Sequence, residues 1–300
     1  MIPAPFEYHR AASLEEASRL LLELGEEAQV LAGGQSLIPL MKLRLARPAA
    51  LVDLNHIPGV AYIEERAGQV RIGAMARHAA VADSPEAAAI PILHDCAAGI
   101  ADVQVRNMGT IGGSVAEADP HGDWAPVLLA LGAEVVTTGP EGERTIAMSQ
   151  FISDAFTTVL RPAELVREIR LPAQAERMAG AYTAFKRCAP VYPTASAAVW
   201  VTMMDEDFCM EARVALGCVG LTPVVATEAA AALSGQAITP HAIDRAAEAA
   251  MAAADPQTDL RGSADYKRLL VGTLTRRALL AALARARGER VAMGHEYAAL

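Results

Sequence analysis

Paired cysteines, long apolar runs and an excess of basic charge are all missing from this 300-residue sequence. The four cysteines are scattered and form no Cys-x-x-Cys pair of the kind that holds zinc or an iron–sulfur cluster, so we expect buried thiols in a reducing compartment and no metal. No apolar run approaches the roughly 20 residues that a bilayer-spanning helix needs, and the first residues lack the layout of a signal peptide. We therefore expect a cytoplasmic protein without a membrane span.

The charge balance argues against polyanionic partners. With 26 Lys and Arg against 35 Asp and Glu, the net charge is −9, which would repel nucleic acid or an anionic membrane surface. A small anionic cofactor can still bind through local backbone amides. The hydrophobic content of 53% is enough for a sizeable core, and the length suggests two domains.

The order of local patterns predicts an α+β fold. A capping box at Ser13 begins a helix that Gly25 ends, and a β-α-β unit follows, with strands at 28–32 and 51–54 around a helix at 37–45. Next we expect a hairpin at 60–73, helices over 77–101, a helix at 124–131, and strands at 133–138, 144–147 and 164–171. After an irregular segment at 172–179 we expect strands at 181–187, 196–204 and 209–217, then helices at 224–233, 240–253 and 264–287.

Two glycine pairs are candidates for binding an anion. Gly33-Gly34 follows the first strand of the β-α-β unit, where free amides and a helix N-terminus could hold a pyrophosphate. Gly112-Gly113 repeats the pattern, and glycine there could take positive φ and present unshielded N–H groups. The alternatives are an ordinary strand-to-helix turn at the first pair, and a bulge or close helix packing at the second.

The polar side chains near the second glycine pair also allow more than one interpretation of their role. One interpretation is a metal site formed by Asp119, His121 and Asp123. Because no second cluster of ligands is evident, we favour Asp123 as a helix cap and ribose-binding carboxylate. Lys186, at a predicted strand end, could place positive charge against a phosphate or a reduced flavin, or it could be a solvated strand end. Neither glycine pair completes Gly-x-Ser-x-Gly, so an esterase is not supported.

The chain resembles the medium, flavin-binding subunit of three-subunit molybdenum hydroxylases, the family of aerobic carbon monoxide dehydrogenase, nicotine dehydrogenase and xanthine dehydrogenase. The resemblance covers nearly the whole chain. It depends on four stretches in the same order and spacing: PAPFEYHRAASLEEA, AGGQSLIPLMKLR, QVRNMGTIGGSVAEADPHGD and DLRGSADYKR.

This resemblance implies a two-lobed FAD-binding fold of the vanillyl-alcohol-oxidase type over residues 1–176, with lobes at about 1–56 and 57–176, and a smaller α+β C-terminal domain over 177–300. It implies non-covalent FAD, with Asp123 on the ribose side, Lys186 on the flavin side, and Ile100 and Val166 as apolar contacts. Gln35 and Ser114 replace the histidine and asparagine of many relatives but still offer hydrogen bonds. The implied cofactor-binding residues are Val30, Leu31, Ala32, Gly33, Gly34, Gln35, Ser36, Leu37, Ile100, Thr110, Ile111, Gly112, Gly113, Ser114, Asp123, Val166 and Lys186.

The resemblance also implies partners. Molybdopterin would lie on a large subunit and [2Fe-2S] clusters on a small one, in a dimer of heterotrimers. This chain would accept electrons from the clusters and pass them to an external acceptor, so we assign it no catalytic acid, base or nucleophile. Two alternatives are a stand-alone FAD oxidoreductase with its own substrate pocket and an interaction subunit that has lost its flavin.

Overall fold

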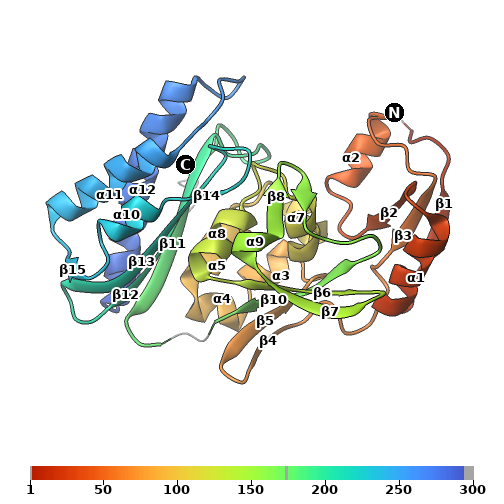
Figure 1. Ribbon diagram of the computed structural model, residues 1–300, viewed down its shortest axis with the longest axis horizontal. Coiled ribbons are helices and arrows are strands. Elements are labelled where there is room, and N and C mark those ends of the chain that lie inside the picture. The colour runs from red at the N-terminus through yellow and green to blue at the C-terminus, as the bar shows by residue number, and fades with distance from the viewer. Residues whose placement is uncertain (1, 173–174, 294–300) are drawn as a thin grey trace.

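The computed structural model describes residues 2–172 and 175–293. Within them the chain forms three parts side by side, each a sheet with its own helices (Figure 1). The first lobe lies at one end, the second lobe in the middle and the C-terminal part at the other end. This mixture of helices and strands confirms the predicted α+β class of two lobes followed by a C-terminal domain.

The first lobe is built on a parallel sheet of three strands in the order β1-β3-β2. The predicted β-α-β unit is confirmed as β2, α2 and β3, whereas β1 was not predicted. The Ser13 half of the capping box is confirmed, because the Ser13 hydroxyl accepts a hydrogen bond from the Glu16 N–H at 3.1 Å. The Glu16 carboxylate accepts from the Ala12 N–H at 2.7 Å instead of the Ser13 N–H. The elements are β1 (Glu7–Arg10), α1 (Leu14–Leu24), β2 (Ala28–Leu31), α2 (Leu37–Lys42) and β3 (Ala50–Asp53).

The second lobe contains an antiparallel sheet in the order β4-β5-β10-β6-β7, packed against short helices. Its strands are β4 (Ile63–Arg66), β5 (Gln69–Gly73), β6 (Glu134–Gly139), β7 (Gly142–Ala147) and β10 (Leu165–Leu171), with a small hairpin of β8 (Ile152–Asp154) and β9 (Thr157–Thr158). Its helices are α3 (His78–Ala82), α4 (Pro85–Ala89), α5 (Pro91–Gly99), α6 (Val103–Met108), α7 (Ile111–Glu117), α8 (Trp124–Leu131) and α9 (Met148–Phe151).

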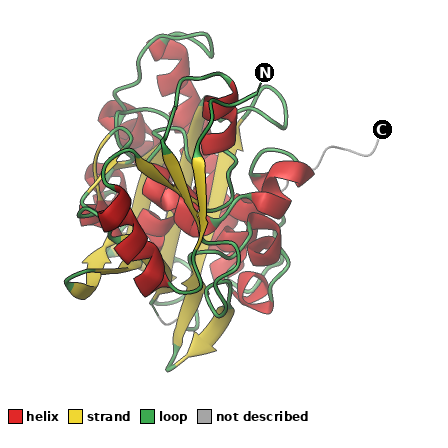
Figure 2. Cartoon of the chain, turned by 90° about the vertical axis from the view of Figure 1, so that its right-hand side faces the viewer, coloured by secondary structure: helices red, strands yellow, loops and turns green. Residues whose placement is uncertain are grey.

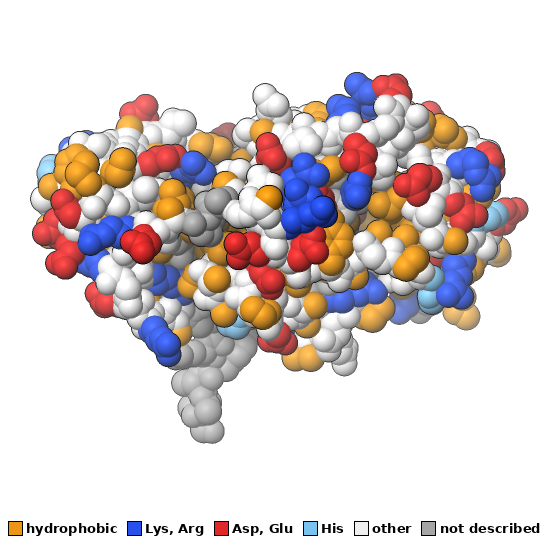
Figure 3. Space-filling model, turned by 90° about the horizontal axis from the view of Figure 1, so that it is seen from below, with side chains coloured by type: hydrophobic (Ala, Val, Ile, Leu, Met, Phe, Trp, Pro, Cys, Tyr) orange, Lys and Arg blue, Asp and Glu red, His pale blue; other side chains and the backbone are white. Residues whose placement is uncertain are grey.

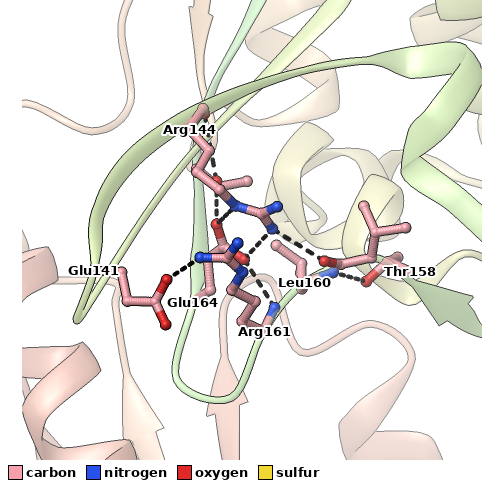
Figure 4. Close-up of polar contacts among 8 residues, drawn as sticks. Glu141, Arg144, Thr158, Leu160, Arg161 and Glu164 are labelled. Carbon is pink, nitrogen blue, oxygen red and sulfur yellow. Dashed lines mark hydrogen bonds and ion pairs between the residues drawn. The ribbon is translucent and has the colours of Figure 1, made fainter.

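A buried carboxylate fixes one corner of the second lobe (Figure 4). Glu164 precedes β10, and its side chain is only 4% exposed. It accepts hydrogen bonds from the Arg144 guanidinium on β7 at 2.6 Å and from the Arg161 backbone N–H at 2.8 Å. The Thr137 hydroxyl on β6 donates a further bond. The loop that leads into β10 is therefore fastened to the β6–β7 hairpin.

The C-terminal part is an antiparallel sheet with three helices on its outer face. The predicted helix over 224–233 is wrong at its start, because residues 224 and 225 pair with β13 and the helix begins later. The elements are β11 (Met178–Phe185), β12 (Ala195–Met203), β13 (Phe208–Gly217), β14 (Val224–Val225), α10 (Thr227–Ala231), β15 (Gln236–Ala237), α11 (Pro240–Ala253) and α12 (Ala264–Ala286).

Both faces of the C-terminal sheet are covered, so the sheet joins two cores. Its outer face packs on α11 and α12, while Tyr182 and Trp200 on the inner face belong to the core of the second lobe. Figure 2 shows strands through the middle of the molecule with helices on both sides. Because the third sheet begins with β11, we propose that the C-terminal domain starts near residue 177; residues 173 and 174 of the predicted boundary segment lie outside the described residues.

The surface carries no large single-sign field on the face in Figure 3, where the described acidic and basic side chains are interspersed. None of the helices in the described residues is long and apolar enough to cross a membrane. Three of the cysteines are buried as expected, but Cys188 is exposed, so the prediction of buried thiols is wrong there.

Candidate cofactor site

All three parts of the molecule border one cavity of about 260 Å³. The first lobe contributes the turn between β2 and α2, the second lobe contributes α7 and the loop before α8, and the C-terminal domain contributes the segment after β11. Most of the predicted cofactor-binding residues line it: Val30, Ala32, Gly33, Gly34, Gln35, Ser36, Leu37, Ile100, Thr110, Gly113, Ser114, Asp123 and Lys186. Leu31, Ile111, Gly112 and Val166 do not.

A row of backbone donors lies in the turn between β2 and α2. The backbone N–H groups of residues 33–37 donate no hydrogen bond to any described residue. Gly34 has φ of +71°, a conformation that glycine adopts without strain and that redirects the chain into α2. Consecutive free amides beside a cavity make a concave binding site for an anion.

The second glycine pair has a different role from the predicted one. Gly112 and Gly113 lie within α7 and have no positive φ, so the predicted turn with unshielded amides is wrong. The Gly112 N–H donates to the Ala74 carbonyl at 2.9 Å, and the Gly113 N–H donates to the Thr110 hydroxyl oxygen at 3.1 Å. Thr110, Gly113 and Ser114 of this segment line the cavity, but the Gly112 and Gly113 amides are used in hydrogen bonds within the protein.

Close chain contacts explain why glycine is required at both pairs. A Cβ atom on Gly33 would lie 2.5 Å from the Met108 carbonyl oxygen and 2.7 Å from the Gly109 Cα. One on Gly112 would lie 2.5 Å from the Ala74 Cβ. The alternative of close packing is therefore confirmed for Gly112, and the two candidate segments pack directly against each other at Gly33.

A polar bridge that the sequence did not reveal fastens the two segments together. The Asn55 side-chain amide donates to the Ala32 carbonyl at 2.8 Å. Arg77 donates to the Asn55 side-chain oxygen at 2.6 Å and also to the Met108 carbonyl. Asn55 lies two residues after the end of β3, and Arg77 directly precedes α3, so the bridge spans the two lobes. It fixes the amide row relative to the opposite wall.

Asp123 and Lys186 form a buried ion pair at the cavity wall. Asp123 precedes α8 but its side chain caps nothing, so the predicted capping role is wrong. Its carboxylate lies 3.1 Å from the Lys186 ammonium and accepts a 2.7 Å hydrogen bond from the Tyr182 hydroxyl. Lys186 also donates to the Gly99 carbonyl at 2.7 Å. The two charged side chains are only 6% and 5% exposed, which rules out the solvated strand end for Lys186.

A second polar group at the cavity involves Asp119 and Tyr192. Burial, then the charge of Asp119 and its hydrogen bond, raise the pKa of the Tyr192 phenol, and the hydroxyl also bonds Ser36. Burial and the charge of Asp119 raise the pKa of Glu117, which lines the same wall. The sequence drew attention to Asp119 through its acidic loop, but no local pattern identified Tyr192 or Glu117.

His78 lines the cavity and contacts the buried Trp124 behind it. The Trp124 indole N–H donates to His78 Nδ1 at 3.1 Å. Burial, together with the charges of Arg77 and Arg106, lowers the pKa of His78 to about 4, so the imidazole is neutral at neutral pH. Among the described residues no three His, Cys, Asp or Glu side chains gather closely enough to hold a metal ion.

Comparison with known proteins assigns this architecture to a family. Residues 4–174 match the FAD-binding domain of molybdopterin dehydrogenases. The chain belongs to this family. Residues 180–282 match the C-terminal domain of the carbon monoxide dehydrogenase flavoprotein. The molybdopterin dehydrogenase family therefore accounts for both the two-lobed part and the C-terminal sheet, and it makes this chain an FAD-binding medium subunit.

Similar proteins span nearly the same length. The medium chain of carbon monoxide dehydrogenase from Afipia carboxidovorans is 43% identical over 96% of this chain and all of its own. The nicotine 6-hydroxylase medium subunit of Paenarthrobacter nicotinovorans is 35% identical over 93% of this chain and 97% of its own. The solved carbon monoxide dehydrogenase of Hydrogenophaga pseudoflava superimposes with a TM-score of 0.92 at 43% identity, covering 95% of this chain and 99% of that one.

The residues at the cavity fit FAD. The free amides of residues 33–37 suit a pyrophosphate, since backbone N–H groups at a helix N-terminus favour negative charge. The buried Asp123 carboxylate suits sugar hydroxyl donors, and Val30, Ile100 and Val105 supply apolar walls.

Proposed function

We propose that this chain carries FAD as the electron-transfer subunit of a molybdenum hydroxylase, accepts electrons from a [2Fe-2S] subunit and passes them to an external acceptor. The observation that carries the proposal is the row of free backbone N–H groups at residues 33–37, in a cavity bordered by all three parts of the family fold. FAD, when bound, supplies the redox chemistry, and the chain supplies position and electrostatics.

Different groups of the chain would bind different parts of FAD. The amides of residues 33–37 hold the pyrophosphate, with the hydroxyls of Ser36 and Ser114 as further donors. Asp123 accepts hydrogen bonds from sugar hydroxyls, and Lys186 places positive charge at the flavin side. Because Asp123 and Lys186 are in contact, we place their actions at adjoining parts of the cofactor. Ile100 contributes an apolar contact.

The proposed partners follow from the kind of protein that the relatives are. Their names describe medium chains or subunits, including those of carbon monoxide dehydrogenase and nicotine 6-hydroxylase. We propose that this chain likewise assembles with a large molybdopterin subunit and a small [2Fe-2S] subunit, as a dimer of heterotrimers. The large subunit would choose the organic substrate, so this chain's residues would not.

Purification of the tagged chain from its native host, under non-denaturing conditions, tests the proposal. We expect a yellow complex that contains FAD, molybdopterin and iron–sulfur clusters in addition to this chain. The molar mass from light scattering should correspond to two copies of each subunit. A colourless monomer would contradict the proposal, and oxidation of an organic donor by the isolated yellow chain would instead indicate a stand-alone flavoenzyme.

A further inference from the structure

We infer that Tyr182 of the C-terminal domain is a positioning residue for the cofactor, whose hydroxyl holds the Asp123 carboxylate in the orientation that binds FAD. The inference rests on the proposed function, because it assigns how one cofactor-binding group is oriented. Tyr182 itself does not line the cavity and acts through Asp123.

The partners of Asp123 come from a different domain. Asp123 precedes α8 in the second lobe. In the described part of the chain, its carboxylate bonds the side chains of Tyr182, at 2.7 Å, and Lys186, at 3.1 Å. Tyr182 lies on β11, and Lys186 directly follows that strand. One strand of the C-terminal sheet therefore holds a carboxylate of the FAD-binding part.

The alternation of β11 explains why both donors reach one carboxylate. Successive side chains on a strand point to opposite faces, so residues 182 and 186 share a face. Ala179 and Ala181 point the other way, into the core beneath α11 and α12. Tyr182 packs into the core of the second lobe, on the face that meets α5 and α8.

Tyr182 is itself rigidly held. Its side chain is buried, and its backbone N–H donates to the Asp95 carboxylate on α5 at 3.1 Å. Asp95 in turn accepts bonds of 2.6 and 2.9 Å from Arg285 on α12, and Arg285 also donates to the Gly180 carbonyl at 2.7 Å. This network fixes β11 at Tyr182, so the hydroxyl is presented at a set position.

The Tyr182 hydroxyl orients the Asp123 carboxylate more precisely than the ion pair with Lys186 does. Burial, then the charge of Asp123, raises the pKa of the Tyr182 phenol well above its usual value, so the hydroxyl stays protonated and donates to the carboxylate. Lys186 is a compact charge on a flexible stem and divides its donors between Asp123 and the Gly99 carbonyl. The phenol fixes one carboxylate oxygen and leaves the remaining acceptor capacity for a ligand in the cavity.

FAD titration of the full-length chain after flavin removal tests the inference, with Tyr182→Phe as the variant. Phenylalanine keeps the buried ring and removes only the hydroxyl. Because a hydrogen bond to a charged group is lost, we expect the dissociation constant for FAD to rise about tenfold. Tyr62→Phe is the matched control, since the Tyr62 hydroxyl also donates to a carboxylate, that of Glu168, away from the cavity. It should bind FAD as the wild type does.

A double-mutant cycle with Asp123→Ala separates positioning from a general structural effect. If Tyr182 acts through Asp123, then Tyr182→Phe adds no further loss of affinity once Asp123 is alanine. Unchanged FAD affinity in Tyr182→Phe, or an equal loss in both backgrounds, would overturn the inference. Failure of the wild-type chain itself to bind FAD would overturn the proposed function, and the inference with it.

Discussion

At the scale of single residues, the glycines of the site are explained by what they touch inside the protein. Gly33 allows the first segment to contact the backbone of residues 108 and 109, and Gly112 allows α7 to contact Ala74. The packing at Gly33 positions the amide row at residues 33–37, whose N–H groups donate no hydrogen bond to any described residue. We therefore expect the FAD affinity of the proposed site to depend on how closely these two chain segments pack.

Gly33→Ala should separate these segments. The added Cβ meets backbone atoms that have little freedom to move, so we expect a loss of about 1–3 kcal/mol in the free energy of unfolding, together with weaker FAD binding. Gly235→Ala is the control, because Gly235 has φ of +72° with nothing within 4 Å of its added Cβ. That variant should lose about 1–2 kcal/mol from backbone strain yet keep its FAD affinity. Equal FAD affinity in both variants would count against the account.

At the scale of elements, the sequence predicts best where the signal is local. The Ser13 cap, the glycine after α1 and the long pattern of α12 each lie within one element, and the structure has all three. The strand β1 was missed because it is four residues long and is stabilised by pairing with β3, some forty residues further along.

The roles of individual site residues were less predictable, because they too depend on contacts between residues far apart in the sequence. Asp123 has the residue type and position of a helix cap, but Tyr182 and Lys186 compete for its carboxylate from about sixty residues away. Gly112 likewise has the sequence pattern of a ligand-binding turn. In the structure, however, glycine is needed there because Ala74 packs closely against it. Such contacts exist only once the sheets have assembled. The family resemblance predicted both residues as cofactor-binding; in the structure Asp123 lines the cavity, whereas Gly112 does not.

The corner at Glu164 gives an element-scale prediction with a pH dependence. Burial by itself would raise the pKa of Glu164, but hydrogen bonds from Arg144, the Arg161 N–H and Thr137 lower it to about 2. A carboxyl with a lowered pKa stabilises the fold above its unfolded pKa of 4.5, and that stability is lost as the pH falls through about 2. Glu164→Gln should therefore cost about 1.5–3 kcal/mol at neutral pH, since hydrogen bonds to a charged group are lost.

The exposed ion pair beside this corner supplies the control. Glu141 pairs with Arg161 in the same view, but its side chain is 73% exposed (Figure 4). Surface pairs contribute little, so Glu141→Gln should cost at most about 1 kcal/mol. Urea unfolding at pH 7 and at stepwise lower pH measures both variants. The deficit of Glu164→Gln should shrink as the pH approaches 2, and a deficit no larger than that of Glu141→Gln would contradict the assigned role.

At the scale of the whole molecule, the cavity exists because three parts meet there. The first lobe supplies free amides, the second lobe supplies the opposite wall and Asp123, and the C-terminal domain supplies Lys186 and Tyr192. The buried pair of Asp95 and Arg285 joins the last two parts close to the site. The C-terminal domain is thus a component of the candidate cofactor site, and the family match extends through this domain.

A crystal structure of the chain with FAD tests the central claim most directly, because the claim concerns where the pyrophosphate of FAD binds. We predict pyrophosphate oxygens within about 3.2 Å of several backbone nitrogens of residues 33–37, with no comparable contact to the amides of Gly112 and Gly113. The sugar hydroxyls should lie near Asp123. A pyrophosphate bound elsewhere, with the amides of residues 33–37 still unpaired, would contradict the account.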